Sequence, residues 1–166
     1  MERLVRMGEL AAAGGGDAAL VTIGLGSCIG LALVDGRVGG LAHVVLPSSN
    51  GQGAQEPGKY GDLAVAALLE AVIAAGAVRS RLVAVLVGGA HMFSFKSASG
   101  DLDIGGRNAA AVEAELAKLR IPVKATATGG SKGRTVRVFP DGGTVVAKEA
   151  GGSEVELHSA HEGALR

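Results

Sequence analysis

The chain has 166 residues, in which 16 basic side chains balance 16 acidic ones, and it contains one cysteine. This length predicts one domain that buries its own core, which we place at residues 1–150, with a flexible C-terminal tail over 151–166. A single cysteine excludes an internal disulfide and suits the reducing cytoplasm. Because the charges balance and form no basic cluster, nucleic acid and anionic membrane surfaces are not expected as partners.

The N-terminal half of the chain predicts three strands. Residues 1–17 favour an edge segment with a loose glycine loop. The apolar runs 19–23, 28–34 and 39–46 are typical of strands because glycines and an Asp-Gly turn bound them. The polar stretch Ser48–Pro57 predicts a loop that could border a site.

Two helices follow in the predicted order. Apolar residues at helical spacing predict the first, with Asp62 as N-cap and Gly76 as the stop. Asn108 is the predicted N-cap of the second helix, which ends before Pro122. Short β-strands are predicted between and after these helices, at 82–87, 123–128, 134–139 and 144–148.

Cys28 ends an uncharged run in which glycines leave backbone amides unshielded, so it is a candidate nucleophile. The amides around Gly26 and Ser27 could stabilise the oxyanion that forms when a thiolate attacks a carbonyl. A lone cysteine in an apolar run is more commonly a small buried hydrophobe. A second group is therefore needed to support the chemistry, and His43 in the next apolar run is the candidate.

The Asp-Gly turn at residues 35–36 sets the register between these two runs. A two-residue loop places Cys28 directly opposite His43, with Cβ atoms about 4.5 to 5.5 Å apart. A loop two residues longer leaves the pair diagonal on the same face. In either register the thiol and the imidazole lie close, and Thr22 could hold the imidazole through its hydroxyl.

Membrane attachment is the main alternative reading of the same region. Residues 18–34 carry no charge, but the run is shorter than the roughly 20 apolar residues of a membrane-spanning helix and contains several glycines. Residues 25–28 also loosely resemble a lipoprotein cleavage box, in which Cys28 would be acylated, although Glu9 and Asp17 interrupt the expected leader. We expect no membrane insertion.

No cofactor or metal site is expected from the sequence. His91 lies near the middle of the chain, and His158 and His161 lie in the predicted tail. Because no second cysteine accompanies these histidines, they do not have the spacing of a metal site.

Two segments resemble the active-site signature of the chemoreceptor glutamine deamidases, the CheD family. They are Thr22-x-x-Leu25-Gly26-Ser27-Cys28 and Gly39-Gly40-Leu41-Ala42-His43, the second followed by Leu46-Pro47. The resemblance continues in the same order to about residue 148, through Lys59-Tyr60-Gly61-Asp62, Gly88-Gly89-Ala90, Ile104-Gly105-x-Arg107-Asn108, Gly129-Gly130 and Gly133-Arg134.

This resemblance implies an α/β fold, an α/β/β three-layer sandwich of mostly antiparallel strands with two main helices. It implies Cys28 as nucleophile, His43 as acid and base, and Thr22 as the residue that orients His43. Pairing with His43 would then raise the thiolate fraction of Cys28 above the few per cent of a free thiol.

The resemblance also implies the substrate and the partners. The expected substrates are glutamine side chains, and also glutamate methyl esters, on the cytoplasmic helices of methyl-accepting chemotaxis receptors. The alternative is a non-catalytic adaptor that binds and regulates a CheC-type chemotaxis phosphatase. In both cases we expect a cytoplasmic protein, with a monomer as the simplest form.

Overall fold

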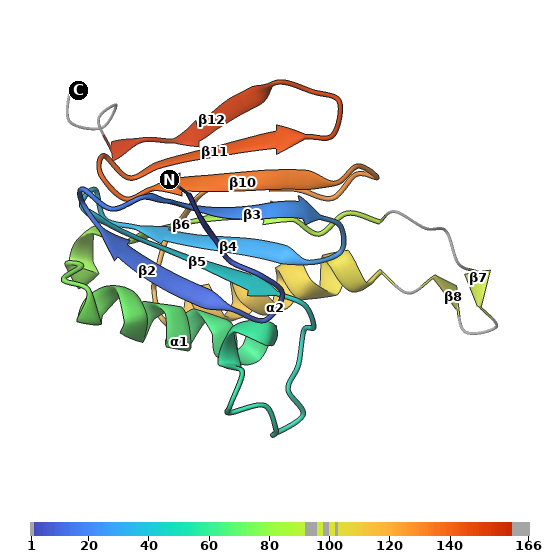
Figure 1. Ribbon diagram of the computed structural model, residues 1–166. Coiled ribbons are helices and arrows are strands. Elements are labelled where there is room, and N and C mark those ends of the chain that lie inside the picture. Colours follow the sequence, from blue (N-terminus) through green and yellow to red (C-terminus); the bar gives the residue numbers. More distant parts are fainter. Residues whose placement is uncertain (1, 92–95, 98–99, 102, 161–166) are drawn as a thin grey trace.

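The computed structural model describes residues 2–91, 96–97, 100–101 and 103–160, and it shows three layers (Figure 1). Two five-stranded sheets pack face to face, and two helices cover the outer face of one of them. The helices are α1 (Gly61–Ala74) and α2 (Ile104–Lys118). This arrangement confirms the expected α/β/β sandwich.

We call the two sheets the helix-covered sheet and the outer sheet. The helix-covered sheet contains, in spatial order, β2 (Leu10–Gly14), β5 (Val38–Val44), β4 (Ile29–Val34), β6 (Val83–Gly88) and β9 (Val123–Thr128). The outer sheet contains β1 (Glu2–Leu4), β3 (Ala19–Leu25), β10 (Arg134–Phe139), β11 (Thr144–Glu149) and β12 (Glu154–His158). The remaining elements are the 3-10 turns Pro57–Lys59 and Arg79–Arg81 and the strands β7 (Lys96–Ser97) and β8 (Gly100–Asp101).

Strands β4 and β5 are buried on both faces, which explains why they contain almost only apolar residues. Alternate residues of β4 face opposite layers. Ile29 and Leu31 pack with the helices, whereas Ala32 and Val34 pack between the two sheets. The helix-covered sheet therefore has a hydrophobic core on each face. Whether a residue has an odd or even position along the strand decides which core it joins.

The turn between β4 and β5 is longer than the Asp-Gly signal predicts. The Asp35 carboxylate accepts hydrogen bonds from two backbone N–H groups within the turn, at 2.9 and 2.7 Å, and this closes a loop over residues 35–38. Gly30 therefore lies opposite His43. The prediction of a two-residue loop is wrong, and the longer alternative, in which Cys28 lies diagonally from His43 on the same face, is confirmed.

Both predicted helix caps are also wrong, for the same physical reason. The α1 helix begins after Tyr60, and Asp62 instead accepts hydrogen bonds from the backbone N–H and the hydroxyl of Ser49, each at 2.9 Å. The α2 helix begins after Asp103, whose carboxylate caps the Gly106 N–H at 2.8 Å. Asn108 lies in the second turn of α2. In each case the polar side chain forms hydrogen bonds with a loop outside its own helix.

The segment after residue 150 contains a further strand. Strand β12 pairs antiparallel with β11 and forms an edge of the outer sheet. The expectation of an irregular tail from residue 151 is therefore wrong for Glu154–His158. Residues 161–166, which include His161, lie outside the described residues.

The uncharged run 18–34 forms strands β3 and β4 rather than a membrane helix. Within the described ranges, no helix is both long and apolar enough to cross a bilayer. Leu20, Val21 and Leu25, which precede Cys28, are completely buried. Processing at Cys28, as a lipoprotein would require, would remove these side chains from the core.

Substituting Gly30 is expected to destabilise the fold at the position opposite His43. A Cβ atom there would lie 2.9 Å from a methyl group of Val136 and 3.0 Å from one of Leu25. Overpacking of this kind costs about 1–3 kcal/mol. We expect Gly30→Ala to lower the free energy of unfolding by that amount in urea denaturation. Gly15→Ala is the control, because its Cβ would only approach a backbone oxygen at 3.6 Å; equal losses in the two variants would contradict the argument.

Candidate active site

Cys28 lies at the junction between β3 and β4, immediately before Ile29. Since Ile29 faces the helices, the alternation of the strand directs Cys28 toward the space between the sheets, where its side chain packs against the core residues. The thiol is half-buried and free. It therefore lies at the end of the sandwich with one side open to solvent.

His43 lies on the adjacent strand β5, and its side chain points to the same inter-sheet face. The imidazole is 7% exposed, so it is buried but reachable from the surface. Its Nδ1 lies 3.3 Å from the backbone carbonyl oxygen of Val5. A carbonyl only accepts hydrogen bonds, so this contact favours the tautomer with the proton on Nδ1 and leaves Nε2 with a free lone pair.

Thr22 comes from the other sheet and is completely buried. Its hydroxyl donates a hydrogen bond to the same Val5 carbonyl, at 2.8 Å. The sequence suggested that Thr22 holds the imidazole directly. In the structure the two side chains share one acceptor instead, so Thr22 reaches His43 through the Val5 carbonyl.

The N-terminal segment that contains Val5 also holds the His43 backbone. The Gly8 N–H donates to the His43 carbonyl, and the His43 N–H donates to the Glu9 carbonyl, each at 2.9 Å. This role was not predicted, because residues 1–17 have the pattern of an edge segment with a loose glycine loop. No side-chain signal could have revealed it, since every group that contacts His43 here belongs to the backbone.

Backbone hydrogen bonds fix the loop before Cys28. The Gly26 carbonyl accepts from the Ala90 N–H at 2.8 Å, and the Cys28 carbonyl accepts from the Gly89 N–H at 2.9 Å. Gly88 has a φ of 111°, and a Cβ atom there would collide with the Cys28 carbonyl oxygen. Only glycine at this position allows β6 to approach the loop at residues 26–28 so closely.

The side chain of Asn108 holds the third carbonyl of this loop, that of Ser27, at 2.9 Å. A trans peptide is planar, so its N–H and C=O point in opposite directions. The carbonyls of Gly26 and Ser27 are both bound within the protein. The N–H of the same peptide, from Ser27 and Cys28 respectively, therefore points away from each of these contacts. Neither N–H has an acceptor among the described residues.

Burial sets the protonation states of the two candidate reactive groups. Desolvation raises the pKa of the Cys28 thiol above its ordinary value. Desolvation also lowers the pKa of His43 below 6.5, although the hydrogen bond to Val5 and the charge of Glu9 act in the opposite direction. Both groups are therefore neutral at pH 7. This differs from the expectation that pairing raises the thiolate fraction, because burial is the cause that shifts the pKa of the Cys28 thiol.

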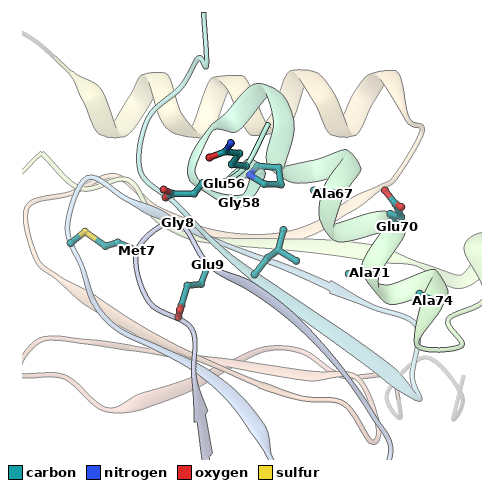
Figure 2. A pocket seen from close by; sticks show the side chains of 12 residues that line it. Met7, Gly8, Glu9, Glu56, Gly58, Ala67, Glu70, Ala71 and Ala74 are labelled. Atoms are coloured by element: carbon teal, nitrogen blue, oxygen red, sulfur yellow. The ribbon is translucent and has the colours of Figure 1, made fainter. Parts of the chain in front are cut away.

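A groove of about 810 Å³ lies next to this region, between the 7–10 segment, the loop at 55–58 and α1 (Figure 2). Gly8 and Glu56 lie at one end of it, and Glu70 and Ala74 of α1 lie at the other. Neither Cys28 nor His43 lines the groove. The 48–57 loop, expected to border the site, reaches this groove through its last three residues.

Comparison with known proteins identifies the family. The family model described as "CheD chemotactic sensory transduction" matches residues 45–149. A Symbiobacterium thermophilum protein named "Probable chemoreceptor glutamine deamidase CheD" is 47% identical over 157 residues, which covers 92% of this chain and 95% of the relative. Proteins of the same name from Clostridium novyi and Moorella thermoacetica are 44% and 47% identical and cover 80% of this chain, with 83% and 81% of their own lengths matched. These matches confirm the resemblance noted in the sequence, and the chain belongs to the CheD family.

Proposed function

We propose that this protein hydrolyses the side-chain amide of glutamine on chemotaxis receptors, with Cys28 as nucleophile and His43 as acid and base. One observation carries the proposal: the two side chains lie on the same face of adjoining strands, and the Val5 carbonyl holds His43 in the tautomer that can accept a proton. The names of the relatives supply the class of substrate.

In the first half of the reaction, His43 Nε2 takes the thiol proton as Cys28 Sγ attacks the carboxamide carbon. A tetrahedral oxyanion forms. The imidazolium then gives its proton to the amide nitrogen, the C–N bond breaks, and ammonia leaves a thioester on Cys28. Because thiol and imidazole are both neutral beforehand, proton transfer accompanies the attack and no preformed ion pair is required.

In the second half, a water molecule attacks the thioester while His43 accepts one of its protons. The C–S bond breaks, the proton returns to sulfur, and the receptor is released with a glutamate side chain. A glutamate methyl ester would react in the same way, with methanol leaving in place of ammonia. Both substrates need a carbonyl at the same position, so one site serves both reactions.

The N–H groups of Ser27 and Cys28 form the oxyanion hole of this proposal. They point away from the carbonyl contacts that fix the loop, and no described residue accepts from them. Donors held in this way stabilise negative charge without reorganising during the reaction. Gly26 supports the hole because it adds no side chain beside these amides.

The receptor substrate is proposed to bind at the open end of the sandwich, with the 48–57 loop and the adjacent groove forming part of the contact surface. Met7, which is 68% exposed, and the loop residues Gln55 and Pro57 line that groove. A CheC-type phosphatase is a candidate to bind this same end and compete with receptors. We place the reaction in the cytoplasm, where receptor signalling helices lie.

Incubation with a receptor signalling fragment tests the proposal. Mass spectrometry of the digested fragment is expected to show conversion of specific glutamines to glutamates by the wild-type protein. The non-catalytic adaptor makes the opposite prediction, which is a stable complex with a CheC-type phosphatase and no conversion on several receptor fragments. That second result would contradict the deamidase proposal.

A further inference from the structure

We propose that Asn108 is a positioning residue that orients the Ser27–Cys28 peptide so that the Cys28 N–H faces the oxyanion. This inference rests on the proposed deamidase function and assigns a role to a side chain far away in the sequence. Asn108 lies in the second turn of α2 and is completely buried. Its side chain binds a backbone carbonyl of the nucleophile loop, residues 26–28, so its effect on the reaction is indirect.

The Asn108 amide joins the two segments that carry the reactive side chains. Its Nδ2 donates one hydrogen bond to the Ser27 carbonyl at 2.9 Å and another to the Val45 carbonyl at 3.0 Å. Ser27 precedes the nucleophile, and Val45 follows the end of the histidine strand. Because both partners are carbonyls, the NH₂ end of the amide must face them, which fixes its orientation.

The consequence for Cys28 appears in the strand ladder. Continuing the β4–β6 register places Cys28 opposite Gly89. The Gly89 N–H donates to the Cys28 carbonyl at 2.9 Å, but the reciprocal bond from the Cys28 N–H to the Gly89 carbonyl is absent. In a regular antiparallel pair both bonds form. The Ser27–Cys28 peptide is therefore rotated out of the ladder.

Asn108 lies where it can hold this rotation. It binds the Ser27 carbonyl on the helix side of the sheet, so the N–H of the same peptide points to the other side. The Cys28 side chain also lies on that other side, packed between the sheets. The amide donor and the sulfur atom thus face the same space, as attack on a carbonyl requires. The bond to the carbonyl also polarises the peptide and strengthens its N–H as a donor.

The amide oxygen of Asn108 supports a role for the two donated hydrogen bonds. Its Oδ1 is buried and has no hydrogen-bond partner among the described residues. Leaving a buried acceptor unpaired costs about 1–3 kcal/mol. A residue present only for packing would avoid this cost with an apolar side chain. The structure therefore tolerates the unpaired oxygen for the sake of the two N–H donors.

The test compares Asn108→Ala with Val112→Ala. Val112 is also completely buried, lies one turn further along α2 and belongs to the helix-side core, which includes no residue of the 26–28 loop. Deamidation of a receptor fragment by Asn108→Ala is expected to lose roughly 10- to 100-fold in kcat, with KM within about twofold, because a misaligned oxyanion donor weakens only the transition state. Val112→Ala is expected to keep kcat within about threefold.

Alkylation of Cys28 by iodoacetamide provides the discriminating readout, since this substitution forms no oxyanion. Its rate in Asn108→Ala is expected to stay within about threefold of wild type. Parallel losses in kcat and alkylation would show that Asn108 merely keeps the loop folded, and this would overturn the proposal. An unchanged kcat would also overturn it. If Asn108→Ala does not fold, Asn108→Leu replaces it, since the leucine side chain has a similar volume and no hydrogen-bond donor.

The NMR chemical shifts of the Cys28 backbone ¹⁵N and amide proton test this inference independently of the proposed function. Loss of the bond to the Ser27 carbonyl is expected to move both shifts in Asn108→Ala and to leave them unchanged in Val112→Ala. A wild-type protein without deamidase activity would refute the proposed function, and the shifts would still report the peptide orientation. Equal shifts in wild type and Asn108→Ala would refute the orientation, whatever the activity.

Discussion

Replacing Cys28 with alanine is expected to reduce glutamine deamidation by about 1000-fold or more, because the reaction then has no nucleophile to form the thioester. The chain contains no second cysteine that could substitute. Conversion of a receptor fragment is measured by mass spectrometry, and binding of the same fragment is measured by titration calorimetry.

Binding and stability provide the controls for this variant. Cys28 is only half-buried, so Cys28→Ala is expected to fold and to bind the fragment with an affinity close to that of wild type. Loss of activity with binding retained would assign the defect to chemistry. Conversion at the wild-type rate by Cys28→Ala would remove the cysteine from the mechanism.

Replacing His43 is expected to have the second largest effect. General acid–base catalysis by a positioned group contributes about 10²- to 10⁴-fold, so His43→Gln is expected to lose that factor in kcat. The burial that raises the pKa of Cys28 makes the loss more severe, since the thiol cannot ionise readily without a base. A variant that keeps most of its activity at pH 7 would show that another group accepts the proton.

The pH profile tests the same role without a change of shape. A neutral imidazole is required to accept the thiol proton, so activity falls as His43 becomes protonated. Because burial lowers the pKa of His43, the acid limb of kcat/KM is expected to have its midpoint below 6.5. The charge of Glu9 raises this pKa, so Glu9→Gln is expected to move the midpoint further toward acid. A midpoint above 6.5, or one that moves the other way, would contradict the assignment.

Thiol and imidazole can be paired from the sequence because the two strands are consecutive. Because side chains alternate along a strand, a loop over 35–36 and a loop over 35–38 both place Cys28 and His43 on one face. The conclusion therefore holds although the predicted register is wrong. The error arose because Asp35 binds backbone N–H groups beyond the two turn residues. A side chain that folds back onto its own loop leaves no periodic signal.

Contacts between distant segments account for the other differences. Asp62 and Asn108 are residue types that favour helix caps. Each instead binds a loop far away in the sequence, and local propensity cannot predict such a contact. Strand β12 has exposed, polar positions because it is an edge of the outer sheet, so its sequence resembles a tail. The Val5 carbonyl contributes only a backbone atom, which every residue has.

The candidate site has one part that sequence predicts, the side-chain types, and one part that depends on long-range contacts, their orientation. The proposed reactive side chains, Cys28 and His43, come from two short segments and can be recognised by residue type. Their orientation depends on Val5, Gly88, Gly89 and Asn108, whose roles follow from the packing of two sheets and a helix. Sequence therefore indicates the candidate reactive atoms, whereas the fold determines how those atoms are oriented.

Detection of the covalent intermediate tests the central claim most directly. Wild-type protein is mixed with a receptor fragment, quenched in acid within the first turnover and digested. Mass spectrometry is expected to find the glutamyl side chain of a receptor peptide attached as a thioester to Cys28, with the amount decaying as the receptor peptide with glutamate appears. Rapid turnover with no adduct at Cys28, or an adduct on a different residue, would contradict the account.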